Sequence, residues 1–183
     1  MAATTGFRMG SLDHVHVRVP DMADALAWYS SHLGFEPVPE YDFWASGVAG
    51  GPVQVSADGG RTCLALFEAN ERSPMIPQEN GIAFSVDADT FVAFARSLPN
   101  GIEHPDGGPL TRDALVDFDL CWAFDLVDPW GNRYELNCYD HARVRVDLVE
   151  ADGITPDRKW PRDLYEHHLA TRPPRATPSP PPL

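Results

Sequence analysis

The segment Leu12-Asp-His-Val-His-Val-Arg-Val-Pro-Asp21 carries the strongest fold signal in the chain. Valine occupies every second position from 15 to 19, and His14, His16 and Arg18 occupy the alternate positions. This alternation is typical of a β-strand with one apolar and one polar face. Two imidazoles on one strand face have Cβ atoms about 7 Å apart, which is close enough for one metal ion to bind both. A polar strand face turned to water explains the same pattern, so the segment alone leaves both interpretations open.

A helix is predicted directly after this strand, over residues 21–34. Apolar side chains recur there at helical spacing, and Asp21 can accept hydrogen bonds from the first backbone N–H groups. Gly34 can adopt the left-handed conformation that ends a helix. Three short strands are then expected, near residues 35–43, 53–57 and 63–68.

The same order of elements begins again in the second half of the chain. The pattern predicts a strand over 81–86, a helix over 89–98, and a hairpin formed by 122–127 and 133–139. The hairpin turns at Asp128-Pro-Trp-Gly-Asn132, where proline and glycine suit the turn positions. An offset of 67 positions superimposes Val19 on Val86. The chain therefore contains strand, helix and three strands, twice.

Composition limits the classes of function. A chain of 183 residues with 43% hydrophobic residues is sufficient for one well-packed domain. A formal charge of −13 disfavours nucleic acids and anionic membranes as partners. The three cysteines have no metal-binding or disulfide spacing, and the N-terminal residues have no apolar stretch for a signal peptide. These features predict a soluble, cytoplasmic protein.

The two ends of the chain differ from its centre. Residues 1–10 are expected to be a flexible N-terminus. Residues 141–171 are expected to form a C-terminal extension, with a strand over 144–149 and a short helix over 162–169. The segment 172–183 is rich in proline and is expected to be a disordered or polyproline tail.

Four motifs in the central region resemble the vicinal oxygen chelate superfamily, which includes glyoxalases, bleomycin-resistance proteins and extradiol dioxygenases. They are Leu12-Asp-His-Val15, Trp28-Tyr29 with Leu33-Gly-Phe35, Gly81-Ile-Ala-Phe-Ser-Val86, and Asp128-Pro-Trp-Gly-Asn-Arg-Tyr-Glu-Leu136. The resemblance implies an α+β fold in one domain over residues 11–140. It also implies two βαβββ modules, about 11–70 and 80–140, whose sheets form a shared cavity.

The resemblance also implies a set of metal ligands. Relatives that use a metal take ligands from the first and last strands of each module, and two of these positions fall on His14 and Glu135. The other two fall on Ala65 and Gly81, neither of which has a side chain that binds a metal. His16 is the expected third ligand, because it shares a strand face with His14. Glu79 and Asn80, which precede Gly81, are alternatives to it.

Two functions follow from these residues. The first is an enzyme that uses a divalent metal ion (Fe, Mn, Zn or Ni) to act on a small oxygen-chelating substrate, as dioxygenases and glyoxalase-like lyases do. Glu135 is a possible catalytic base, and the expected substrate cavity includes Arg18, Ala65, Gly81 and Asn137. The second is a metal-free protein that binds a drug or metabolite, as bleomycin-resistance proteins do. The partner in either case is a small molecule, and a homodimer is compatible with both.

Overall fold

Two β-sheets form the framework of the computed structural model, which describes residues 11–76 and 81–171. The first sheet has the strand order β1-β4-β3-β2, and the second has the order β5-β8-β7-β6-β9. The strands of the first sheet are β1 (His14–Val19), β2 (Glu36–Pro37), β3 (Val53–Ser56) and β4 (Cys63–Glu68). Those of the second are β5 (Gly81–Ser85), β6 (Val116–Asp117), β7 (Trp122–Val127), β8 (Arg133–Cys138) and β9 (Asp157–Arg158). The predicted α+β class is confirmed.

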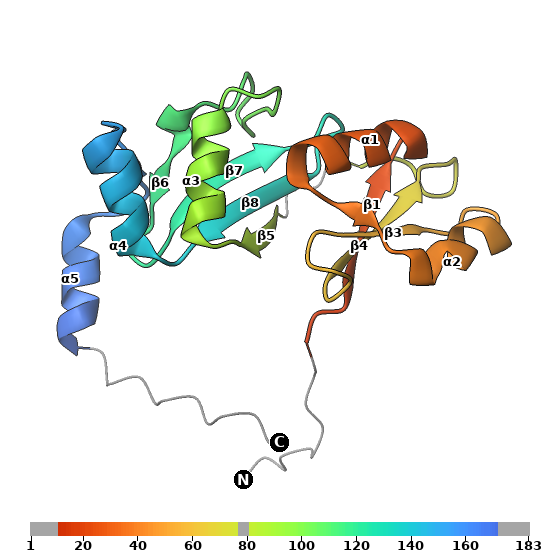
Figure 1. The fold of residues 1–183 in the computed structure, drawn as a ribbon, viewed down its shortest axis with the longest axis horizontal. Coiled ribbons are helices and arrows are strands. Elements are labelled where there is room, and N and C mark those ends of the chain that lie inside the picture. The colour runs from red at the N-terminus through yellow and green to blue at the C-terminus, as the bar shows by residue number, and fades with distance from the viewer. Residues whose placement is uncertain (1–10, 77–80, 172–183) are drawn as a thin grey trace, which may run out of the picture.

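One helix covers each sheet, α1 (Met22–Leu33) in the first module and α3 (Ala88–Ser97) in the second (Figure 1). Asp21 caps α1 by accepting a hydrogen bond from the backbone N–H of Asp24, and α1 ends at Gly34, which has a φ of 68°. Asp87 caps α3 in the same way as Asp21 caps α1. No helix within residues 11–76 and 81–171 has the length and apolar character needed to cross a membrane.

The two modules repeat one pairing scheme, as the internal offset in the sequence indicates. β1 lies parallel to β4, and β5 lies parallel to β8, while the remaining neighbours inside each module are antiparallel. In both sheets, alternate side chains pack against the helix and form the core, and the intervening ones lie on the opposite face. We call that opposite face the open face of each sheet.

The segment after α1 differs from its prediction. Only Glu36–Pro37 of the expected strand over 35–43 is extended. A turn of 3-10 helix (η1, Pro39–Tyr41) and a short helix (α2, Asp42–Gly47) follow, and α2 packs beside β3. Proline at the first position of η1 has the φ that a helical turn needs and lacks an N–H that a strand would use.

The predicted strand over 144–149 is wrong. This segment continues from α4 (His141–Val144) into a π-helical segment, η3 (Arg145–Ala151). Val144 and Leu148 are both buried, and their spacing of four residues is helical. Val146, which a strand would place on the same face as Val144 and Leu148, is 51% exposed, so the buried residues follow a helix face and not a strand face.

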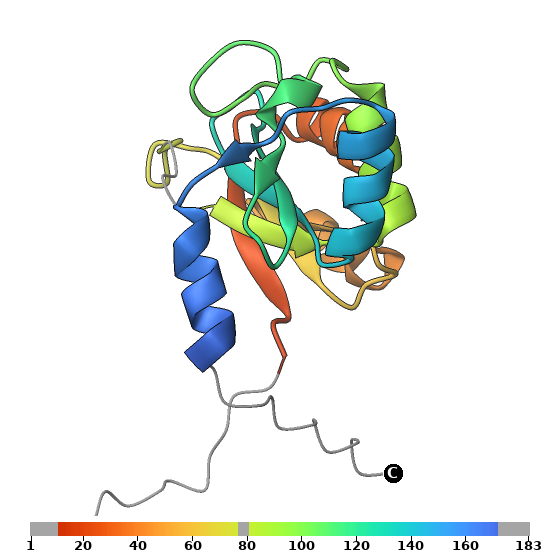
Figure 2. The same cartoon turned by 90° about the vertical axis from the view of Figure 1, so that its left-hand side faces the viewer.

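The rest of the C-terminal extension returns to the second sheet. β9 pairs in parallel with β6 and becomes the outermost strand, next to which α5 (Arg162–Thr171) begins (Figure 2). The helix α5 agrees with the short helix that the sequence predicts. The predictions for residues 1–10 and 172–183 lie outside the described residues.

A buried hydrogen-bond network joins the two modules at Asp128, in the turn between β7 and β8. Its carboxylate accepts hydrogen bonds from the hydroxyl of Tyr29 on α1 (2.7 Å) and from the side-chain amide of Asn132 (2.6 Å). The Tyr29 hydroxyl also lies 2.6 Å from the hydroxyl of Tyr134, and the Asn132 amide donates to the carbonyl of Arg18 on β1. Helix and strand of the first module are thus held to the last hairpin of the second.

Replacing Asp128 with alanine should destabilise the protein strongly. The substitution leaves the Tyr29 hydroxyl and the Asn132 amide without their acceptor in a buried site, which costs about 3 kcal/mol. Urea denaturation followed by circular dichroism measures the change in the free energy of unfolding. Asp113→Ala, an exposed carboxylate on the second module, is the control and should change it by less than about 0.5 kcal/mol. Equal losses in the two variants would contradict the role of the network.

The tyrosines of this network predict a loss of stability in alkali. Burial is the main cause that raises the pKa of both Tyr29 and Tyr134 above the ordinary tyrosine value of about 10. The unfolded chain therefore releases these two protons above about pH 10, whereas the folded protein retains them, so the free energy of unfolding falls as pH rises. Each tyrosine contributes a slope of about 1.4 kcal/mol per pH unit. Urea denaturation between about pH 11 and 12, where the unfolded tyrosine is almost fully ionised, should give a slope for Tyr134→Phe that is shallower by about this amount. An unchanged slope would count against the burial of an unionised Tyr134.

Candidate functional site

His14 and His16 form a close pair on the open face of the first sheet. Their rings are stacked, with centroids 5.1 Å apart, and their Nε2 atoms are 3.2 Å apart. The carboxylate of Asp13 lies against Nδ1 of His14. If Nδ1 carries the proton that Asp13 accepts, then Nε2 of His14 has a free lone pair that is directed at His16. Two Nε2 atoms at this distance need either one proton between them or one cation that binds both.

Gln54 on β3 is a site residue that the sequence analysis missed. It is 4% exposed, and its Oε1 atom is buried and has no hydrogen-bond partner among the described residues. Gln54 pairs with Ala65 across β3 and β4, and Ala65 pairs with His16 across β4 and β1. Gln54 and His16 therefore belong to one row of the open face. Because buried acceptors are nearly always satisfied in proteins, this oxygen indicates a missing donor or cation. We call His14, His16 and Gln54 the first-sheet half-site.

Glu135 occupies the open face of the second sheet. The side-chain amide of Asn137 donates a hydrogen bond to its Oε1 atom, and Asp125 is its direct neighbour across β7 and β8. Two carboxylates in such a pair repel each other unless a cation lies near them. Asp125 is visible in the sequence as an acidic residue in the middle of the otherwise apolar run Trp122–Val127. The sequence analysis did not use this signal.

A polar pocket of about 380 Å³ surrounds Glu135. We call it the second-sheet pocket. Its lining comes from β5, β7, β8, the loop at residues 104–106 and the C-terminal extension, and it includes Gly81, Ala83, His104, Asp106, Asp125, Arg133, Glu135 and Lys159. A Cβ atom added to Gly81 would meet nothing closer than 3.8 Å, so the pocket has room at this position.

One chain does not bring the predicted metal ligands together. His14 and His16 lie on the first sheet and Glu135 lies on the second, and no group of three His, Cys, Asp or Glu side chains within the described ranges can hold a metal ion. The prediction of one intrachain cavity with all three is therefore wrong. Strand alternation correctly assigns each side chain to an open face, but it does not say which surface lies opposite that face.

The remaining predicted residues divide between the two sheets in the same way. Arg18 and Ala65 lie on the open face of the first sheet, where the Arg18 guanidinium is 4.9 Å from the ring centroid of Phe67. Gly81 lies in the second-sheet pocket, and Asn137 orients Glu135. The alternative ligands Glu79 and Asn80 lie outside the described residues.

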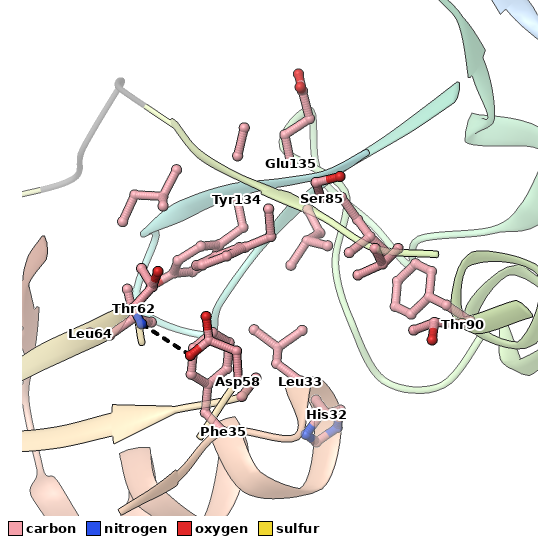
Figure 3. Close-up of a pocket in the computed structure, with 18 of the residues that line it drawn as sticks. His32, Leu33, Phe35, Asp58, Thr62, Leu64, Ser85, Thr90, Tyr134 and Glu135 are labelled. Atoms are coloured by element: carbon pink, nitrogen blue, oxygen red, sulfur yellow. Dashed lines mark hydrogen bonds between the residues drawn. The ribbon is translucent and has the colours of Figure 1, made fainter. Parts of the chain in front are cut away.

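An apolar cavity of about 690 Å³ lies between the modules, on the helix side of both sheets (Figure 3). We call it the inter-module cavity. Most of its lining is aliphatic or aromatic, including Val15, Leu33, Phe35, Leu64, Phe84 and Leu136. Asp58 lies at its edge, where the backbone N–H of Thr62 donates a hydrogen bond to its carboxylate and lowers its pKa. Glu135 contributes to the rim, but its carboxylate points away from the cavity.

Comparison with known proteins identifies the family. The family model of the Glyoxalase/Bleomycin resistance protein/Dioxygenase superfamily matches residues 11–136, and the chain belongs to this superfamily. The match includes the first-sheet half-site and Glu135, and it ends before the C-terminal extension. No curated protein matches the sequence.

Two solved structures with a TM-score above 0.5 support the same fold. A glyoxalase/dioxygenase from Nostoc punctiforme has a TM-score of 0.51 and 22% identity, covering 76% of this chain and 98% of that one. An integron cassette protein from the Halifax Harbour sewage metagenome has a TM-score of 0.51 and 20% identity, covering 71% and 99%. The fosfomycin resistance protein FosX from Listeria monocytogenes has a TM-score of 0.46 and 14% identity, covering 75% and 99%.

Proposed function

We propose that the protein is a metal-dependent enzyme whose active site is completed between two copies of the chain. The observation that carries this proposal is the pair of imidazoles on β1, whose Nε2 atoms are 3.2 Å apart. Neighbouring nitrogen ligands of one divalent ion are separated by a similar distance, since each lies about 2.1 Å from the metal. The unpartnered Oε1 of Gln54 in the same row supports a polar or cationic occupant.

The separation of the half-sites is the reason for a second copy. In one chain, the histidine pair and Glu135 lie on the open faces of two different sheets. A two-fold axis can place the first sheet of each chain opposite the second sheet of its partner. Each dimer then has two equivalent sites, and each site combines His14 and His16 with Glu135 of the partner subunit.

The donor set fits a divalent transition metal. Two imidazoles and one carboxylate leave open coordination positions for a substrate with two adjacent oxygens. A metal ion bound there would act as a Lewis acid towards those oxygens. Gln54 would accept a hydrogen bond from a substrate hydroxyl. Asn137 holds the Glu135 carboxylate in place, and Glu135 is also placed to accept a proton. These roles suit dioxygenase- or lyase-like chemistry.

Metal binding tests this proposal directly. Isothermal titration with Mn²⁺ should give about one site per wild-type chain, and His14→Ala or Glu135→Ala should weaken binding by roughly 10- to 100-fold, because each removes a direct ligand. His167→Ala, on the exposed helix α5, is the matched histidine control and should bind normally.

A mixture of the two defective variants tests the two-copy arrangement. His14→Ala and Glu135→Ala chains that are unfolded together and refolded form heterodimers, in which one site loses both residues and the other is intact. The mixture should therefore recover about a quarter of the wild-type Mn²⁺ sites. A dimeric mixture that recovers none, or a wild-type monomer that binds the metal fully, would refute the two-copy site.

The inter-module cavity favours a second candidate function, the binding of an apolar small molecule without chemistry. Its volume of about 690 Å³ lies within the range of ligand pockets, and its lining is mainly apolar with a few polar groups at the edge. These properties are those of a drug- or metabolite-binding protein.

A substitution at the mouth of the cavity tests this second candidate. Ala93 on α3 is exposed and lines the cavity, so Ala93→Trp should reduce its volume without disturbing the core. We expect the affinity for the neutral dye Nile red, measured by fluorescence, to fall about tenfold. Ala23→Trp, on the exposed face of α1, is the control and should have no effect. Equal affinities in wild type and both variants would exclude the cavity as a binding site.

A further inference from the structure

Lys159 is the only lysine in the chain, and it lies in the second-sheet pocket with Glu135. It belongs to the C-terminal extension, beyond the residues that the family model matches. Its side chain is 48% exposed and its Nζ atom is 3.3 Å from Asp157, which is itself largely exposed. The extension therefore adds a positive charge to a site that the family fold builds without it.

The backbone at Lys159 is held firmly on both sides. The preceding residue, Arg158, forms ion pairs with Asp117 and Asp119, whose carboxylates are both largely buried. On the other side, the indole of Trp160 donates a hydrogen bond to Asp119. Because β9 also pairs with β6, the backbone next to Lys159 has a defined position, while the ammonium group of Lys159 stays accessible.

The register of the strands brings the start of β9 to the face that carries Glu135. Asp157 pairs with Val116, Val116 pairs with Ala123, and Ala123 lies two residues before Asp125. All of these positions share the open face of the second sheet. Lys159 is the first residue after β9, at a bend in the chain, and it lines the same pocket as Glu135.

Arg133 supplies a second positive charge in this pocket. It precedes Glu135 by two residues on β8, and it forms no ion pair within residues 11–76 and 81–171. The carboxylates of Glu135 and Asp125 also lack an ion pair there. If a cation binds Glu135, as the proposed function requires, the guanidinium of Arg133 can bind an anionic ligand, and the ammonium group of Lys159 can exchange its exposed partner Asp157 for that ligand.

We propose that Lys159 and Arg133 determine specificity by binding an anionic group, such as a carboxylate, of a substrate whose adjacent oxygens are chelated at Glu135. This inference rests on the proposed function and narrows its substrate class to oxygen-chelating organic anions. Lys159 approaches from the extension, and Arg133 approaches from β8. The anionic group binds in the pocket between them.

Two catechols that differ only in charge test this inference. The probes are 3,4-dihydroxybenzoate and its neutral isostere 3,4-dihydroxybenzamide, which present the same pair of adjacent oxygens. We expect the Mn²⁺-loaded wild-type protein to bind the benzoate more tightly in isothermal titration. Lys159→Gln should weaken benzoate binding about three- to tenfold and leave benzamide binding unchanged, because only the charge contact is lost. Lys159→Arg should retain the preference.

Controls separate this inference from the proposed function. Arg145→Gln removes an exposed charge from the extension outside the pocket and should not alter either affinity. Acetylation of the single lysine by an amine-selective reagent, measured by mass spectrometry, should slow when the benzoate is present and not when the benzamide is. A protein that binds neither probe, or for which Lys159→Gln affects both equally, overturns the role of Lys159. A preference for the benzoate that persists without Mn²⁺ supports that role and contradicts the metal-dependent function.

Discussion

The buried carboxylate of Asp128 determines how the two modules sit together. A charge that is 2% exposed is tolerated only when donors surround it, and here the donors come from Tyr29 of one module and from the β7–β8 turn of the other. Because the contacts are directional, they allow little rotation between the sheets. That constraint fixes where the two open faces lie relative to each other. The distribution of polar groups over the surface of the chain is a consequence of this one junction.

Much of the fold could be predicted from local patterns, because strand alternation and helix caps act over a few residues. Asp21, Gly34 and the alternating valines of β1 are examples. The failures arose where distant segments decide the structure. Val144 and Leu148 are buried by a helix packing that their own sequence does not specify. In the candidate site, the faces of His14 and Glu135 followed from alternation, but the surface opposite each face did not.

The residues that sequence reasoning missed share a physical cause. Gln54 and Lys159 gain their significance from strand pairings with segments that are remote in the chain. A glutamine between two valines is an ordinary strand residue until its amide oxygen is found buried, with no hydrogen-bond partner in the part of the chain that the structure describes. The structure also separates two kinds of chemistry across the thickness of each sheet. Polar groups that suit a metal and an anion lie on the open faces, whereas the apolar cavity lies under the helices.

Gly81 on β5 lies at a position where the second sheet leaves room for a side chain. A Cβ atom placed on this glycine would be 3.8 Å from its nearest neighbour, the carbonyl oxygen of Arg133. Strand β5 can therefore carry a side chain here without rearrangement. A side chain at this position can therefore be added or removed while the framework of the sheet stays intact. The chemistry at this edge of the second sheet is therefore set by single side chains and not by the backbone that carries them.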